Sequence, residues 1–333
     1  MHKYITLSHG SGSTLMAGLI KDVFVKQFNN RILSRLDDAA VFCVAKSTLA
    51  FTTDSFTIKP LFFPGGDIGR LSLCGTINDL AAQGALPIAI AVSLIIEEGF
   101  AMHDLIKIVN SMAQTAKKNK VAIVTGDTKV VGRKEADGIF ITTTGIGIVH
   151  KNFKVSSTRV KKNDVIIVSG TIADHGISIL NARGKLGFEP PLRSDAASLY
   201  PLIRHCSCLG SHIHAMRDPT RGGVVGVLFE IARASKVGIT IFEKNIPIKK
   251  QISHACELLG YDPLFVANEG KMIFFVEKNK ASAVLKKIQQ HPLGRNAAII
   301  GIVTSGNTVT LKTTVGTERL LMMPEGELLP RIC

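Results

Sequence analysis

The chain has 333 residues, of which 46% are hydrophobic and 20% are charged, so a single small module and a chain disordered throughout are both excluded. Its net charge of +14 lies mainly in residues 151–333, which hold 25 basic and 14 acidic side chains. Because there is no Trp and the lysines fall in short, scattered pieces, a solvated basic face is favoured over nucleic-acid binding.

Hydrophobic periodicity predicts alternating helices and strands in the first half of the chain. The predicted helices span residues 14–28, 67–83 and 102–118. The predicted strands, rich in β-branched and aromatic residues, span residues 40–45, 48–55, 85–96 and 121–125, and a pair of strands interrupted by glycine is predicted over residues 138–150. A polar, basic segment at residues 151–163 follows, and it predicts a domain boundary near residue 152.

The second half repeats this alternation with a different sequence. Its predicted helices span residues 176–182, 196–214, 224–234 and 281–290. Its predicted strands span residues 165–169, 239–242, 272–276 and 297–303. From residue 322 two prolines and a glycine oppose both helix and central strand. We therefore expect domains at residues 1–152 and 153–320, followed by a flexible tail at 321–333.

The compartment follows from what the sequence lacks. The longest apolar run, residues 85–96, contains a proline and is too short to cross a membrane. The N-terminus does not show the charged and then apolar layout of a secretory signal. We therefore expect a cytoplasmic protein with reduced thiols and no membrane association.

The six cysteines contain no CxxC pair, which argues against a disulfide scaffold or a zinc ribbon. Histidines and cysteines between residues 205 and 214 could be drawn as a metal site. However, Leu202, Cys206 and Leu209 recur at helical spacing, and on a helix Cys206 and Cys208 would point about 200° apart. We therefore expect a packed helix there rather than a metal centre.

Neither common phosphate-binding fingerprint is present, because both GxxxxGK[ST] and a complete GxGxxG are missing. Instead, Asp38, Asp54, Asp79 and Asp127 stand near predicted strand ends or helix junctions. Each could be an ordinary turn or cap residue. Carboxylates that converge from several elements also suit a Mg²⁺-triphosphate site, because Mg²⁺ prefers oxygen ligands and bridges to phosphate.

Three features of the second half could also carry chemistry. Arg221 precedes an apolar helix whose N-terminal amides could bind an anion, although an ordinary loop with a good helix start is an equal alternative. Glu269 stands two residues before Lys271. It could be a proton-transfer group, or the two residues could form an ordinary ion pair on the surface. Cys333 ends the chain, and a mobile thiol can carry a group between active sites.

Taken together, the motifs resemble the HypE family of hydrogenase maturation factors, in the superfamily of aminoimidazole ribonucleotide synthetase (PurM) and selenophosphate synthetase. The resemblance runs nearly end to end. The segments that carry it are SHGSGS, DDAAV, FTTDSF, PGGDIG, IIEEGF, VTGDTKVV, RDPTRGG, ANEGK and the final PRIC. One departure is Ser13, where the family's glycine-rich turn usually has glycine.

The resemblance implies a two-domain α/β (α+β) PurM-like fold, with mixed sheets flanked by helices and N-terminal domains that pair into a dimeric β-barrel. It also implies an enzyme that uses ATP to dehydrate a carbamoyl group on its C-terminal cysteine to a thiocyanate. The carbamoyl group would come from the carbamoyltransferase HypF. The cyano group would pass to iron on a HypC–HypD complex, for the [NiFe] hydrogenase active site.

The same resemblance implies roles for individual residues. Mg²⁺-ATP would be surrounded by Asp38, Asp54, Asp79 and Asp127, with support from Asn78, Gly126, Thr128 and Arg221. Cys333 would be the covalent carrier, and Lys129 and Glu269 would activate and deprotonate the thiocarboxamide. Two alternatives stay open: another enzyme of the superfamily, such as a selenophosphate synthetase or a small-molecule kinase, and an ATP-binding scaffold that only docks maturation partners.

Overall fold

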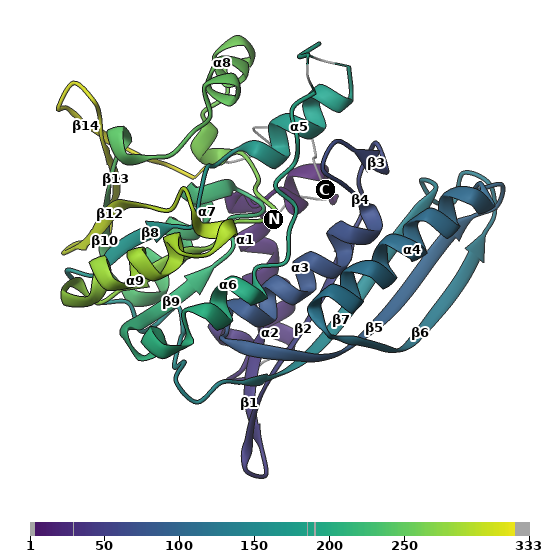
Figure 1. The fold of residues 1–333 in the computed structure, drawn as a ribbon, viewed down its shortest axis with the longest axis horizontal. Helices are drawn as coiled ribbons and strands as arrows, with labels where there is room; N and C mark the ends of the chain where they lie inside the picture. Colours follow the sequence, from purple (N-terminus) through teal and green to yellow (C-terminus); the bar gives the residue numbers. More distant parts are fainter. Residues whose placement is uncertain (1–3, 29, 185, 190, 324–333) are drawn as a thin grey trace.

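The structure is a computed structural model that describes residues 4–28, 30–184, 186–189 and 191–323. It contains a five-stranded sheet in the first half of the chain and a seven-stranded sheet in the second, each flanked by helices (Figure 1). The predicted mixed α/β architecture is confirmed. Among the described helices, none is both long and apolar enough to span a bilayer.

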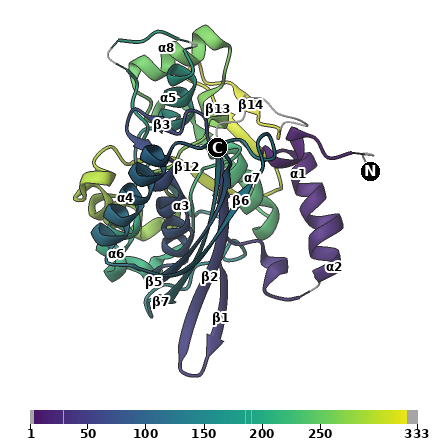
Figure 2. The ribbon, with the colours of Figure 1, turned by 90° about the vertical axis from the view of Figure 1, so that its right-hand side faces the viewer.

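The first sheet has the order β1-β2-β7-β5-β6, with β5 and β6 parallel and the other neighbours antiparallel. Its strands are β1 (Ala40–Val44), β2 (Ser47–Phe56), β5 (Ala85–Glu97), β6 (Ala122–Val131) and β7 (Ile139–Val149). A short hairpin, β3 (Phe62–Phe63) and β4 (Gly66–Asp67), precedes helix α3. Helices α3 (Ile68–Ala82) and α4 (Met102–Asn119) cover one face of this sheet (Figure 2).

Helix α3 is buried along almost its whole length. It begins at Asp67, whose Oδ1 accepts hydrogen bonds from the N–H groups of Gly69 and Arg70 at 2.8 and 3.0 Å. One side packs on β2 and β7, and the other side meets the second half of the chain. Neighbouring residues of α3 can therefore face different halves of the molecule.

The other face of the first sheet carries apolar side chains that remain half-exposed. Phe51, Leu86, Ile95 and Ile148 expose between 40% and 44% of their surface. Strand β6 is an edge strand, and its residues 122–130 are all exposed. The first sheet is therefore covered by helices on one side only.

The second sheet has the order β14-β13-β10-β12-β8-β11-β9. Its strands are β8 (Val165–Val168), β9 (Ile213–Arg217), β10 (Gly238–Phe242), β11 (Ile273–Val276), β12 (Ala298–Thr304), β13 (Val309–Lys312) and β14 (Glu318–Leu320). The helices of this half are α5 (Asp174–Ala182), α6 (Tyr200–His205), α7 (Gly223–Ser235), α8 (Lys250–Leu259) and α9 (Ala281–Gln289). Strands β8 and β11, two neighbouring inner strands of this sheet, are fully buried.

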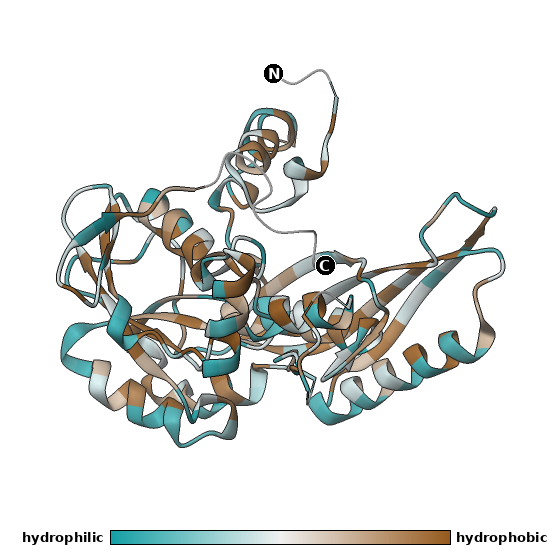
Figure 3. Cartoon of the chain, turned by 90° about the horizontal axis from the view of Figure 1, so that it is seen from above, coloured by the Kyte–Doolittle hydropathy of each residue, from teal (hydrophilic) through white to brown (hydrophobic). Residues whose placement is uncertain are grey.

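The N-terminal helical segment stands apart from both sheets (Figures 2 and 3). It consists of α1 (Thr14–Leu19), a π-helical stretch at Ile20–Val25 and α2 (Lys26–Phe28). The predicted helix over residues 14–28 is thus confirmed, with a π-helical middle. Its aromatic rings Phe24 and Phe28 stack on each other with centroids 6.2 Å apart.

The predicted helix over residues 196–214 is wrong. The chain forms α6, then a 3₁₀ helix at Ser207–His212, and then strand β9, which pairs antiparallel with β11. Sheet pairing overrides the helical spacing of the apolar residues. Gly210 lies in this 3₁₀ helix and packs closely on Phe153, since a Cβ there would lie 2.9 Å from the ring.

The predicted pair of strands over residues 138–150 is wrong, because these residues form the single strand β7, which pairs with both β2 and β5.

The predicted strand over residues 121–125 is too short. Strand β6 continues to Val131, because the segment after Thr125 keeps its parallel pairing with β5. Asp127 therefore lies inside a strand, opposite Ser93, rather than beyond a strand end.

Candidate active site

Four aspartates gather where the two halves of the chain meet. Asp38 precedes β1, Asp54 lies in β2, Asp79 lies in α3 and Asp218 follows β9. Burial raises the pKa of Asp79 well above its usual range, and the negative charges of Asp218, Asp38 and Asp54 raise it further. These carboxylates are therefore close enough to repel one another.

The hydrogen bonds of the cluster leave part of it unsatisfied. Arg217 Nε donates to Asp38 Oδ1 at 2.9 Å, and Thr52 Oγ1 donates to Asp79 Oδ2 at 2.8 Å. Asp38 Oδ2 is buried and has no partner. A buried carboxylate oxygen without a partner is costly, so it marks a place where a cation or a donor belongs.

Two further pKa shifts describe the same environment. Burial raises the pKa of Asp218 to about 6, and the charge of Asp54 adds to the rise. Burial also raises the pKa of Asp54, while the nearby charge of Arg221 lowers it in part. The cluster thus combines several acidic groups with two cations, Arg217 beside Asp38 and Arg221 near Asp54.

These residues fit a magnesium ion that arrives with phosphate. In the described part of the chain, no three His, Cys, Asp or Glu side chains form a ready-made metal site. Mg²⁺ usually takes only one or two carboxylates and completes its shell with water and phosphate oxygens. The repelling carboxylates and the free oxygen of Asp38 match that mode of binding better than a protein cage would.

Arg221 belongs to a tight contact between two glycine-rich turns. Gly12 has a φ of +73°, and a Cβ on it would lie 2.8 Å from the carbonyl carbon of Arg221. Only glycine tolerates both conditions. The N-terminal turn therefore packs against the loop before α7, which places it beside the aspartate cluster.

Residues 126–129, which were predicted to contact Mg²⁺-ATP or the substrate, lie away from the aspartate cluster within one chain. In the sheet register Asp54 pairs with Thr143, Thr143 with Val92 and Val92 with Gly126. Asp54 and Gly126 thus share a row, three strand spacings or about 14 Å apart. A Cβ on Gly126 would lie 2.3 Å from the carbonyl oxygen of Val92, so glycine lets this edge strand pair closely.

Asp127 and Lys129 lie on the opposite face of the sheet from Asp54. Asp127 shares a register row with Ser55, whose hydroxyl bonds to that of Thr142 at 2.9 Å. Successive residues of a strand point to opposite faces, so Asp127 and Lys129 face away from α3 and Thr128 faces toward it. Within one chain, the structure does not bring Asp127 or Lys129 together with the aspartate cluster.

Asn78 is buried and its carboxamide contacts the second half of the chain. Nδ2 donates to the carbonyl oxygen of Ala197 at 3.1 Å and, more weakly, to that of Glu269 at 3.5 Å. Oδ1 accepts a hydrogen bond from the N–H of Leu199 at 2.7 Å. The structure therefore gives Asn78 main-chain partners where the sequence predicted phosphate oxygens.

Glu269 is 5% exposed and lies in the loop before β11. Its N–H donates to Asp195 Oδ1 at 3.1 Å, and Lys271 Nζ donates to Asp195 Oδ2 at 2.9 Å. The carboxylate that pairs with Lys271 is thus Asp195, which is remote in sequence. Burial alone raises the pKa of Asp195, but Lys271 and His175 outweigh it and hold this pKa below its usual value.

The histidines and cysteines between residues 205 and 214 are dispersed among other partners. His212 and His214 bond through Nδ1 to Glu277 and Asp164, at 2.8 and 2.7 Å. Cys206 is buried, whereas Cys208 is exposed.

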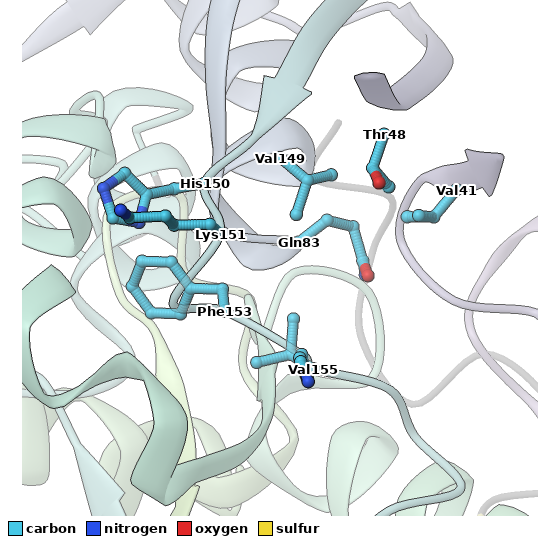
Figure 4. A pocket seen from close by; sticks show the side chains of 9 residues that line it. Val41, Thr48, Gln83, Val149, His150, Lys151, Phe153 and Val155 are labelled. Atoms are coloured by element: carbon cyan, nitrogen blue, oxygen red, sulfur yellow. The ribbon is translucent and has the colours of Figure 1, made fainter. Parts of the chain in front are cut away.

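A pocket of about 260 Å³ lies beside the start of β2 and the end of β7 (Figure 4). None of the predicted site residues lines it. Its lining is formed by Val41, Thr48, Gln83, Val149, His150, Lys151, Phe153, Lys154 and Val155. The predicted carrier Cys333 lies outside the described residues.

Two aspartates that were not among the predicted site residues lie beside residues that were. Asp218 joins the aspartate cluster, and its only signal in the sequence was its place in the RDPTRGG segment. Asp195 lies next to Glu269, and no motif pointed to it.

Known proteins resemble the chain over almost its whole length. Residues 36–149 match the family model "AIR synthase related protein, N-terminal domain", and residues 161–313 match "AIR synthase related protein, C-terminal domain". The chain is 46% identical to a protein of Bradyrhizobium diazoefficiens named carbamoyl dehydratase HypE, over 99% of this chain and 96% of the relative.

Solved structures agree with this similarity. One is the crystal structure of a HypE–HypF complex, with a TM-score of 0.88 and 46% identity, over 92% of this chain and 99% of that one. Another is hydrogenase maturation protein HypE in complex with ATP, with a TM-score of 0.83 and 41% identity. That match covers 99% of this chain and 100% of that one.

Proposed function

The chain belongs to the HypE family of carbamoyl dehydratases, within the AIR synthase related proteins, and we propose that it uses ATP to convert a carbamoylated Cys333 into a thiocyanate. In this proposal the cyano group supplies the cyanide ligand for the iron of a [NiFe] hydrogenase. The carbamoyl group is received from a HypF carbamoyltransferase, and a HypC–HypD complex accepts the cyano group. A solved ATP complex of a similar protein supports ATP as the ligand, and a solved HypE–HypF complex supports HypF as a partner.

The observation that carries the proposal is the aspartate cluster at the junction of the two halves. Asp38, Asp54, Asp79 and Asp218 repel one another, and Asp38 Oδ2 has no partner. These carboxylates would hold Mg²⁺ together with ATP, and the ion would neutralise charge on the triphosphate. We propose that the metal takes its carboxylate ligands from Asp38, Asp54, Asp79 and Asp218 and completes its shell with water and phosphate oxygens. Arg221 is the proposed phosphate contact at the edge.

Dehydration of a thiocarboxamide needs two kinds of assistance from the protein. The carbonyl oxygen must become a leaving group, which transfer of the ATP γ-phosphoryl group achieves. Both amide protons must then be removed as the C≡N bond forms and phosphate leaves, which requires a base nearby. We assign the removal of a proton to Glu269, whose buried position excludes water, and the polarisation of the amide to Lys129.

A second copy of the chain would complete this arrangement. The uncovered face of the first sheet carries half-exposed Phe51, Leu86, Ile95 and Ile148, and the same face holds Asp127 and Lys129. Apolar surface of this kind favours association. A homodimer that pairs these faces into a β-barrel would bury them and would place Asp127 and Lys129 of each copy at the interface. Gly126 and Thr128, in the same strand, lie on the opposite face.

Intact mass spectrometry of the full chain tests the proposal. We expect incubation with HypF, carbamoyl phosphate and Mg²⁺-ATP to add one carbamoyl group, followed by ATP-dependent loss of one water. Cys333→Ala should bind ATP as the wild type does and should gain no adduct. An adduct retained in Cys333→Ala would overturn the carrier assignment, and an adduct that never loses water would overturn the dehydratase assignment.

A further inference from the structure

We propose that Asn78 is a positioning residue, whose buried carboxamide fixes the main chain of Glu269 across the boundary between the two halves, and that it does not bind phosphate. The inference rests on the proposed role of Glu269 as the base. It assigns to Asn78 a function in the dehydration step rather than in nucleotide binding.

The first support is that the carboxamide is fully engaged. Asn78 is 1% exposed, and both its donor and its acceptor atoms bond to the main chain of the second half. Nδ2 lies between the carbonyl oxygens of Ala197 and Glu269, at 3.1 and 3.5 Å. A phosphate would have to displace these bonds and leave buried main-chain groups unpaired, which is unfavourable.

The second support is that the main chain of Glu269 is bonded on both sides. Its N–H donates to Asp195 Oδ1 at 3.1 Å, and its carbonyl oxygen accepts from the N–H of Ala197 at 3.2 Å as well as from Asn78. Asp195 is in turn paired with Lys271 at 2.9 Å. Asn78 comes from the first half of the chain and bonds firmly to Ala197 and Leu199, but only weakly, at 3.5 Å, to Glu269 itself. It therefore acts on Glu269 mainly through Ala197, whose N–H donates to the Glu269 carbonyl oxygen.

The third support is the close packing of the next residue. A Cβ on Gly270 would lie 1.9 Å from the carbonyl oxygen of Asp195, so only glycine fits there. The loop that carries Glu269 therefore lies directly on the segment around Asp195 and Ala197. A loop fixed in this way holds its side chain in one place, as a base needs for efficient proton transfer.

The place of Asn78 in α3 gives the arrangement a functional meaning. The next residue, Asp79, contacts Thr52 in the first sheet and belongs to the aspartate cluster. Asp79 thus belongs to the proposed ATP site, and its neighbour Asn78 contacts the loop that carries the proposed base, Glu269. Because both residues belong to the rigid helix α3, this helix sets the position of the ATP site relative to that loop.

A double-mutant cycle tests the inference on the carbamoylated full chain. We expect Asn78→Ala to bind ATP within about twofold of the wild type by calorimetry, and to lose water at least about tenfold more slowly in a single turnover at saturating Mg²⁺-ATP. Glu269→Gln should also be slow. The double variant should be no slower than Glu269→Gln alone, because a positioning residue has no effect once its base is gone.

The matched control is Asn119→Ala. Asn119 is also a buried asparagine, at 7% exposure, and its Nδ2 donates to the Thr115 carbonyl oxygen at 2.9 Å within α4. It should lose water at the wild-type rate. If Asn78→Ala proves unstable, Asn78→Asp keeps the size and the acceptor for Leu199 but loses the donor toward Glu269, and the same slow dehydration is expected.

Each other outcome contradicts a defined statement. A tenfold weaker ATP affinity with an unchanged rate at saturation would restore the phosphate role of Asn78. If the rate losses of Asn78→Ala and Glu269→Gln multiply in the double variant, then Asn78 has a structural role that is independent of Glu269. A wild-type rate in Glu269→Gln would instead reject the proposed base, which is a separate failure.

Discussion

Arg217 and Asp38 form an ion pair across the boundary between the two halves of the chain, with Arg217 Nε 2.9 Å from Asp38 Oδ1. Arg217 also donates to the carbonyl oxygen of Leu36 at 2.9 Å and to the carboxylate of Glu230. Burial works against its charged form, but the negative charges of Asp38 and Glu230 outweigh this and raise the pKa of Arg217. The pair uses one oxygen of Asp38 and leaves the other for a ligand.

Replacing Arg217 should destabilise the metal-free protein. Arg217→Met leaves the charge of Asp38 buried and unpaired, which we expect to lower the free energy of unfolding by about 3 kcal/mol. Chemical denaturation measures this change. Arg217→Lys, which keeps the charge but cannot reach all three partners, should lose less, and equal losses in the two variants would contradict a role for the charge.

Asp79→Asn should raise the stability of the ligand-free protein and lower its affinity for Mg²⁺-ATP. The pKa of Asp79 is raised by burial and by its acidic neighbours, so its ionised form opposes folding at neutral pH. The variant should therefore be more stable without ligand, by about 1 kcal/mol or more, and should bind Mg²⁺-ATP at least about tenfold more weakly. Thermal unfolding and calorimetry measure the two effects. A less stable variant that binds ATP normally would show that Asp79 is not a ligand.

The pKa of Asp218 predicts a pH dependence of binding. This pKa is about 6 in the folded protein, above the usual value of 3.8. The folded protein therefore favours the protonated carboxyl group. The stability that this preference contributes is present below pH 4 and is lost as the pH rises through 6. A cation needs the ionised form. Affinity for Mg²⁺-ATP should therefore fall about fivefold from pH 6 to pH 5 through this group, because the ionised fraction falls from about one half to about one eleventh.

Asp218→Asn is the control for that experiment, because ATP itself also takes up protons in this range. The difference in slope between the wild type and Asp218→Asn isolates the contribution of the carboxylate. Identical slopes would remove Asp218 from the set of ligands.

The aspartate cluster shows how far the sequence could lead. Asp38, Asp54 and Asp79 were predicted as a group from their acidic motifs, and the structure places them within reach of one another. Asp218 was missed because one carboxylate between an arginine and a proline carries no periodic signal. Its place in the cluster becomes visible only when β9 is paired into the second sheet, which brings the end of this strand beside α3 and beside Asp38.

Strand β6 shows why other parts could not be predicted. The face on which Asp127 lies depends on register across three strand pairs, and those pairs join residues far apart in the chain. A shift by one residue would move Asp127 to the other face. Helix α3, in contrast, was predicted well because its start signal, Asp67, is local.

Charge placed on the uncovered sheet face should prevent the proposed pairing. Ile95 is 41% exposed on that face, and Ile95→Lys should convert a homodimer into a monomer, because it places a charge in a surface that pairing would dehydrate. Light scattering coupled to size-exclusion chromatography measures the mass. Leu258→Lys is the matched control, since Leu258 is 76% exposed on α8 and lies outside that face.

A protein that is dimeric in both variants would place its interface elsewhere. A wild type that is monomeric at every concentration would reject the homodimer itself.

The exposed edge strand β6 has a consequence for how the protein behaves on dilution. If Asp127 and Lys129 act only in the presence of a second copy, then turnover per chain is set by the fraction of chains that are paired. That fraction falls with the total concentration once it drops below the dissociation constant of the dimer. Specific activity should then rise with enzyme concentration and reach a plateau, so this protein's rate is a property of how many copies a cell holds as well as of each active site.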